Sequence, residues 1–164
     1  MKNTSGLIRA LIVLGAALVL GAVNFAIVGK ERIRRDGEVV YLRLAPVDPR
    51  SLIQGDYMAL RFELAQKLQG DAGTATKREG ETAFAEVALD ANRVAALALP
   101  GAPTRLRLRY RIRNGQVWLG TNAFFFEEGS ASRFNDARYG EFRVDRVSGE
   151  AVLVGLRDLS LRAL

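Results

Sequence analysis

The feature that most constrains this chain is an apolar run near its N-terminus. Residues 10–28 read ALIVLGAALVLGAVNFAIV, nineteen residues without a charge, and Asn24 is the one strongly polar member. At ~1.5 Å per residue, a helix of this length roughly matches the ~30 Å hydrocarbon core of a bilayer. Cleavage after Ala22 would put Leu20 at the −3 position, where a signal peptidase expects a small residue. The run therefore predicts an uncleaved transmembrane anchor, with a cleaved signal peptide and a buried core helix as the alternatives.

Charge is distributed unevenly along the chain, whose net charge is +6. Residues 1–35 carry six basic residues against one acidic residue, whereas residues 36–164 carry 18 against 17. Because the body is close to neutral, a basic surface for nucleic acid is not predicted. The chain has no cysteine and no histidine, which excludes disulfides, thiol catalysis, histidine-based triads and the usual zinc sites. A site for Ca²⁺ or Mg²⁺ built from carboxylates alone stays open; we predict no metal and no cofactor.

The flanks of the anchor give conflicting signals about orientation. The basic run KERIRR, residues 30–35, follows the span, and the positive-inside rule alone would keep the following domain in the cytoplasm. A short N-terminus, one span and a folded domain are instead the usual layout of a signal anchor that exports its domain. We predict a single-pass protein of the cytoplasmic membrane with a periplasmic C-terminal domain. The predicted parts are an N-terminal flank 1–9, an anchor 10–28, a basic juxtamembrane linker 29–37 and a β-domain 38–164.

After residue 37 the pattern changes to the period of two that is typical of half-buried strands. Asn114-Gly115 is a strong hairpin signal, and residues 130–140 favour one or two helical turns. In the segment MALRFEL, residues 58–64, alternation predicts one strand with Met58, Leu60, Phe62 and Leu64 on one face. The segment 116–126 reads as one returning strand. The fold class is mainly β: an antiparallel sandwich or open barrel of about seven to eight strands.

One predicted strand, RLRLRYRIR, places a row of like charges on a single face. Such charges repel each other unless groups of opposite charge lie nearby. The row is either a surface that binds anionic lipid or glycan, or a solvated face whose arginines pair with neighbouring carboxylates; the near-neutral body favours pairing. The candidate anion-binding residues are Arg105, Arg107, Arg109, Arg111 and Arg113.

The segment IQGDYMALRF, residues 53–62, is the clearest motif in the body. Gly55 is suited to a positive φ, Asp56 to bonding backbone donors in a turn, and Tyr57 to starting a strand. The approach to this turn resembles type I signal peptidases, but Val47 stands where their nucleophilic serine would be. If Asp56 and Tyr57 met the downstream Tyr139 and Glu141 in one pocket, an envelope enzyme based on carboxylates and tyrosine would result.

The residues GDYMALRF resemble the motif that names the GDYXXLXY family of bacterial proteins. Gly55, Asp56, Tyr57 and Leu60 match it, whereas Phe62 replaces the final tyrosine. The flanking segments LRLAPVDPRSLIQ, ARYGEFRVD and AVLVGLRDLSLRAL also resemble the family. The resemblance implies an N-terminal membrane segment and, often, a gene beside that of a multi-spanning membrane protein. It implies no activity, so it supplies no catalytic residues.

The leading prediction is a membrane-anchored, non-enzymatic accessory or interaction subunit of a bacterial membrane assembly. Its predicted partners are the membrane and a multi-spanning membrane protein, without nucleic acid. Envelope catalysis and anion binding are the alternatives. The candidate functional residues of the motif and of the downstream loop are Gly55, Asp56, Tyr57, Leu60, Tyr139 and Glu141.

Overall fold

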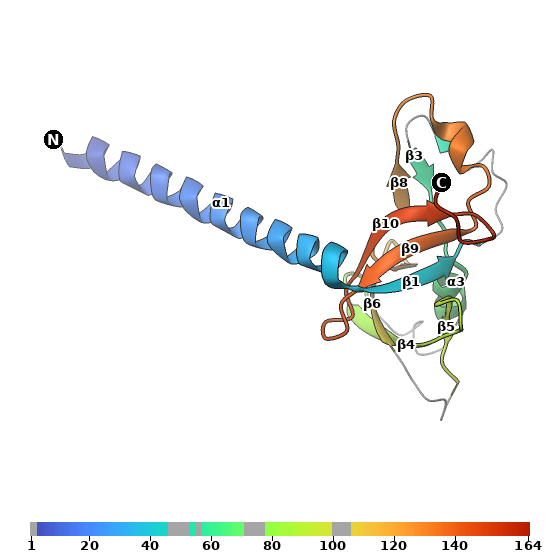
Figure 1. Cartoon of the computed structure of the whole chain (residues 1–164). Coiled ribbons are helices and arrows are strands. Elements are labelled where there is room, and N and C mark those ends of the chain that lie inside the picture. Colours follow the sequence, from blue (N-terminus) through green and yellow to red (C-terminus); the bar gives the residue numbers. More distant parts are fainter. Residues whose placement is uncertain (1–2, 46–52, 55–56, 71–77, 100–105) are drawn as a thin grey trace. The chain divides into compact units, whose positions relative to one another are not determined.

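The computed structural model describes residues 3–45, 53–54, 57–70, 78–99 and 106–164 (Figure 1). The chain divides into two compact units, Met1–Arg32 and Ile33–Leu164. We describe each unit by itself.

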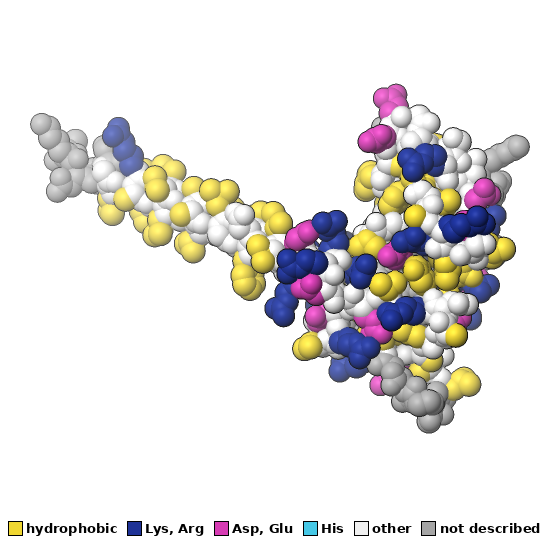
Figure 2. Space-filling model, viewed as in Figure 1, with side chains coloured by type: hydrophobic (Ala, Val, Ile, Leu, Met, Phe, Trp, Pro, Cys, Tyr) yellow, Lys and Arg dark blue, Asp and Glu magenta, His cyan; other side chains and the backbone are white. Residues whose placement is uncertain are grey.

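The first unit belongs to the helix α1, which runs from Asn3 to Asp36 (Figure 1). Its apolar side chains are exposed; Leu14 is 58% exposed and Phe25 83%. Figure 2 shows these side chains along the length of the helix. The segment Gly6–Asp36 is long and apolar enough to cross a membrane. The predicted apolar helix is thus confirmed, and the basic residues 30–35 lie in its continuation.

One sheet of the second unit joins the two ends of the domain. It contains β1 (Glu38–Arg43), β9 (Tyr139–Val144) and β10 (Ala151–Arg157), antiparallel in the order β1-β9-β10. Val40 and Leu42 of β1 and Phe142 and Val144 of β9 lie fully buried in the core. The strand β1 shows the period-two burial that the sequence predicts, whereas residues 139–142 of β9 are all buried.

A second sheet contains β5 (Ala95–Leu97), β4 (Thr82–Leu89), β6 (Leu106–Arg113) and β7 (Gln116–Trp118) in that order. Both turn residues between β6 and β7 have positive φ, 50° at Asn114 and 67° at Gly115. This is the backbone of the two-residue hairpin that Asn-Gly predicts. The apolar face of β6 is buried as expected, through Leu106, Leu108, Tyr110 and Ile112.

The two sheets meet around one core and form a half-barrel. On one side, Tyr41 of β1 forms a parallel bridge with Val94, just before β5. On the other, the Arg109 N–H of β6 donates to the Gly149 carbonyl in the β9–β10 turn, at 2.7 Å. These bonds satisfy backbone groups that the strand edges would otherwise leave open.

A third, short sheet carries the motif. It consists of β2 (Ile53–Gln54), β3 (Tyr57–Ala59) and β8 (Ala123–Phe125), in the order β2-β3-β8. The helix α3 (Glu63–Gln69) follows the motif, and the 3₁₀ helix η1 (Ala131–Phe134) provides the helical turn expected over 130–140.

Two predicted strands were wrong in their extent. The strand expected over 58–64 ends at Ala59, and α3 begins at Glu63. Because Leu64 and Leu68 are both buried, this segment follows a helical spacing of four that overrides the local alternation. The strand expected over 116–126 is divided into β7 and β8, which belong to different sheets. Gly120, with φ +74°, lies at the break.

The mainly β fold class is confirmed. Among the described residues the strands number ten, more than the seven or eight expected. The division of the 116–126 segment and the two-residue strand β2 contribute to this difference.

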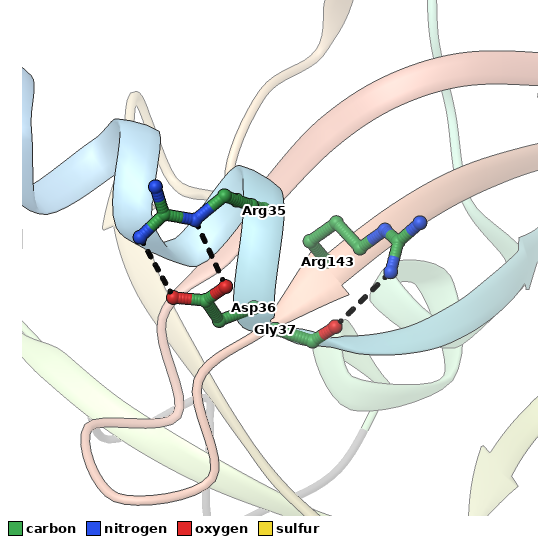
Figure 3. A network of polar contacts seen from close by, with 4 residues as sticks. All are labelled: Arg35, Asp36, Gly37 and Arg143. Atoms are coloured by element: carbon green, nitrogen blue, oxygen red, sulfur yellow. Dashed lines mark hydrogen bonds and ion pairs between the residues drawn. The ribbon is translucent and has the colours of Figure 1, made fainter.

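The start of β1 is fixed by Gly37 (Figure 3). The Gly37 N–H donates to the Ile33 carbonyl at 2.9 Å, and a Cβ at this position would lie 2.5 Å from that same oxygen. The Arg143 guanidinium of β9 donates to the Gly37 carbonyl at 3.3 Å, while the neighbouring Arg35 and Asp36 form an ion pair at 3.0 Å. Glycine is therefore required here by space, because backbone atoms occupy the position of a side chain.

Candidate functional site

The first half of the motif begins the short sheet. Gly55 and Asp56 lie outside the described residues. Tyr57 starts β3 and is paired with Gln54 of β2 and Phe125 of β8. Its ring lies 5.7 Å from that of Phe125, which is 75% exposed, and Tyr57 itself is half-buried. This end of the motif therefore reaches the surface through two neighbouring aromatic rings.

The second half of the motif joins other elements through its backbone. The Leu60 N–H donates to the Asn122 carbonyl, just before β8, at 2.6 Å. The Arg61 carbonyl accepts from the Ala45 N–H, just after β1, at 2.8 Å. Phe62 then precedes α3 with an extended backbone, φ −107° and ψ 135°. Three consecutive residues thus connect the half-barrel, the short sheet and a helix.

The two apolar motif residues are core residues. Leu60 and Phe62 are each 3% exposed. The Phe62 ring packs edge-on against Phe142 of β9, with centroids 5.3 Å apart. A Cβ on Gly140 would lie 3.0 Å from the Phe62 ring, so that glycine makes room for it. Although Phe62 lacks the hydroxyl of tyrosine, its ring has a packing role that needs no hydroxyl.

A cavity of about 350 Å³ lies beside this half of the motif. Ala59–Phe62 form one wall, residues of α3 form another, and Gln116–Leu119 with Thr121 and Asn122 complete it. The sequence pattern does not reveal this site, because its walls are about 50 residues apart and the strand predicted over 58–64 overlaps the start of the helix that forms one of them. The sequence feature that could have indicated this cavity is its set of amide side chains, Gln66, Gln69, Gln116 and Asn122.

Gln69 fixes the helix wall of the cavity. Its Nε2 donates to the Gly115 carbonyl at 2.5 Å, and its Oε1 accepts from the Val117 N–H at 3.5 Å. The side-chain amide therefore takes a backbone donor and a backbone acceptor of the β6–β7 hairpin. This interaction ties the last turn of α3 to β7.

Tyr139 and Glu141 share one face of β9, two residues apart, and each is 6% exposed. Arg157 of β10 donates through Nε to the Glu141 carboxylate at 2.5 Å, and its Nη2 forms an ion pair with the same oxygen. The Arg43 guanidinium lies 5.5 Å from the Tyr139 ring centroid. Tyr57 belongs to another sheet, and Asp56 is outside the described residues. The structure thus brings two of the four proposed catalytic residues together, and the convergence of all four stays a prediction.

The arginine side chains of β6 are contacted mainly by aromatic rings. Arg107 lies 4.3 Å from the Phe84 ring centroid, and Arg113 lies 5.1 Å from that of Trp118. Arg109 forms an ion pair with Glu150 at 2.9 Å. Arg111 is exposed, and Arg105 lies outside the described residues. Cation–π contacts and one carboxylate therefore offset much of the repulsion that the sequence suggests. Anion binding by this row stays a prediction.

The remaining electrostatic feature is a surface pair. The pKa of Arg146 is raised because its guanidinium donates a hydrogen bond to Glu38 at 2.7 Å and lies beside that charge. Arginine is protonated at physiological pH in any case, so this pair supplies no proton-transfer group. Within the described ranges, no three acidic, histidine or cysteine side chains gather in a way that could hold a metal ion.

Comparison with known proteins adds one finding. A family model with the description GDYXXLXY protein matches residues 19–156, which extend from within α1 almost to the end of β10. Neither the curated proteins nor the solved structures contain a match to this chain.

For the Glu141–Arg157 pair, we predict that removing one partner lowers the free energy of unfolding more than replacing both partners does. Arg157→Met should lower the free energy of unfolding by about 3 kcal/mol, because it leaves a buried carboxylate unpaired. This is the lower end for buried pairs, since the Arg157 side chain is 25% exposed. Glu141→Leu combined with Arg157→Met should recover most of the loss. Chemical denaturation of the unsubstituted protein, the Arg157→Met and Glu141→Leu single variants and the double variant measures this, and additive losses would show that the pair is not coupled.

Proposed function

The chain belongs to the GDYXXLXY family, and from this premise we propose that it is a membrane-anchored accessory subunit of a membrane assembly. In this proposal α1 crosses the cytoplasmic membrane once, and the β-domain lies on the periplasmic side. The domain acts by binding a multi-spanning membrane protein and carries out no catalysis.

The observation that carries the proposal is the exposure of the apolar residues of α1. Those from Leu7 to Val28 are between 49% and 83% exposed where they are large. An apolar surface of this size on a soluble monomer is unusual and marks an interaction with membrane or protein. Since the helix is long and apolar enough to span a bilayer, lipid is its simplest covering.

A neighbouring membrane helix is supported by the small residues of α1. A Cβ added at Gly15 or Gly21 would meet no atom within 4 Å. Small residues on a membrane helix let another helix approach closely, and van der Waals packing then stabilises the contact. This feature suits a partner that itself has helices in the bilayer.

The engagement of acidic side chains supports a non-catalytic domain. Glu141 is held by Arg157, Glu150 by Arg109 and Glu38 by Arg146. A carboxylate whose oxygens are held by an arginine is not positioned to take a proton from a substrate. We interpret these pairs as interactions that hold strands and turns in place.

Orientation can be tested with single cysteines, because the chain has none of its own. Val147 lies in the β9–β10 turn and is 93% exposed. We expect Val147→Cys to react with a membrane-impermeant maleimide equally well in intact and in lysed spheroplasts. Asn3→Cys, before the apolar run, is the matched control and should react only after lysis. The reverse pattern would place the domain in the cytoplasm.

The accessory role predicts a stable neighbour. After mild crosslinking in cells and extraction in detergent, the full chain should co-purify with a multi-spanning membrane protein. Gly15→Leu with Gly21→Leu should reduce that recovery several-fold by filling the open positions on α1. Leu14→Ile with Leu20→Ile is the control, because it changes shape without adding bulk. Recovery of the protein alone would contradict the role.

A further inference from the structure

The cavity beside the motif has the size and the walls of a small-molecule site. Its volume of about 350 Å³ lies at the lower end of the ~300–1,000 Å³ that such pockets span. Each wall is held independently: Phe62 is anchored in the core, Leu60 is bonded to Asn122, and Gln69 clamps α3 to the hairpin. A ligand would therefore enter a preformed site and would not have to order it, which favours binding.

Several polar groups on these walls are available to a ligand. Within the described part of the chain, no hydrogen bond occupies the side chains of Arg61, Gln66, Gln116 and Asn122. Each amide offers an oxygen acceptor and two N–H donors, and the guanidinium offers five donors. Trp118, half-buried on the same wall, adds one N–H donor and the part of its ring that the Arg113 guanidinium, 5.1 Å from the ring centroid, does not cover.

This set of side chains selects among ligand classes. Sites for apolar ligands are lined mainly by hydrophobic groups, whereas this one has several amides, so a lipid chain is disfavoured. An extended peptide would add to the edge of β7, but Gln69 already takes the outward N–H of Val117. Amides that donate and accept, beside an indole ring, match a ligand with many hydroxyls and an apolar C–H face.

The charge of the cavity lining narrows the class of ligand further. Among the described residues that line the cavity, Arg61 is the one that carries a charge, and it is exposed. Guanidinium binds carboxylate through two parallel hydrogen bonds, which adds both strength and direction. A ligand that carries a carboxylate would therefore be preferred over its neutral counterpart.

We propose that this cavity binds an acidic saccharide, in the manner of a uronic acid unit of an envelope or environmental polysaccharide. Arg61 pairs with the carboxylate, the side chains of Gln66, Gln116 and Asn122 bond the hydroxyls, and Trp118 lies against the sugar ring. The site shares no residue with α1. A failure of either proposal therefore leaves the other standing.

The chain carries its own reporter, because Trp118 is its single tryptophan. The full-length protein in detergent is titrated with digalacturonate and, as the neutral comparison, with cellobiose. We expect a saturable change in tryptophan fluorescence with digalacturonate and a much weaker response to cellobiose. Arg61→Gln should weaken digalacturonate binding about tenfold, because it removes a charge-assisted pair. Lys67→Gln, which removes one positive charge on α3 outside the cavity, should leave binding unchanged.

Three results would overturn the proposal. One is the lack of a saturable response to digalacturonate at millimolar concentration. Another is equal affinity of the Arg61→Gln and unsubstituted proteins, with Gln66→Ala also without effect. The third is an Arg61-dependent response to a tripeptide that ends in a free carboxylate, in place of the saccharide. Circular dichroism of each variant shows that it is folded, and the exposed side chains concerned are not needed by the core.

Discussion

The arrangement of this domain depends on how the chain passes from β3 to α3. Over three residues the backbone bonds first to the segment before β8 and then to the residue after β1. The side chains of Leu60 and Phe62 enter the core, where Phe62 packs against Phe142. Backbone satisfaction and apolar burial are thus achieved by the same short segment. The half-barrel, the short sheet and the cavity wall all meet there, so the position of each depends on it.

The residues of the motif have different roles at this location. Leu60 and Phe62 position elements, whereas Tyr57 lies half-buried beside the exposed Phe125. Arg61, between the two core residues, is exposed, and it lines the cavity together with Leu60 and Phe62. A segment that both packs the core and lines a pocket can connect stability with ligand binding. The helix α1 has a separate requirement, which is a covering for its apolar surface.

Much of the fold could be predicted from the sequence, and the exceptions have physical causes. The apolar run, the Asn114-Gly115 hairpin and the alternating faces of β1 and β6 were recognisable because local pattern and burial agree there. The strand predicted after Ala59 was wrong, because two patterns overlap there. Leu60, Phe62 and Leu64 alternate as in a strand, while Leu64 and Leu68 have helical spacing, and only tertiary packing decides between the two. The cavity was missed for the same reason. The pairing of Arg157 with Glu141 depends on the register of β9 and β10, including the irregularity between Leu153 and Gly155, which no local pattern reveals.

The most direct test of the account compares two phenylalanines, Phe62 and Phe125, by chemical denaturation of the full chain in detergent. Phe62 is 3% exposed and Phe125 is 75% exposed. Phe62→Ala should lower the free energy of unfolding by about 3–5 kcal/mol, because it removes a buried ring and leaves a cavity at the junction. Phe125→Ala should change it by less than about 0.5 kcal/mol, as surface substitutions usually do. Similar small losses for both variants would contradict the claim that the end of the motif holds the domain together.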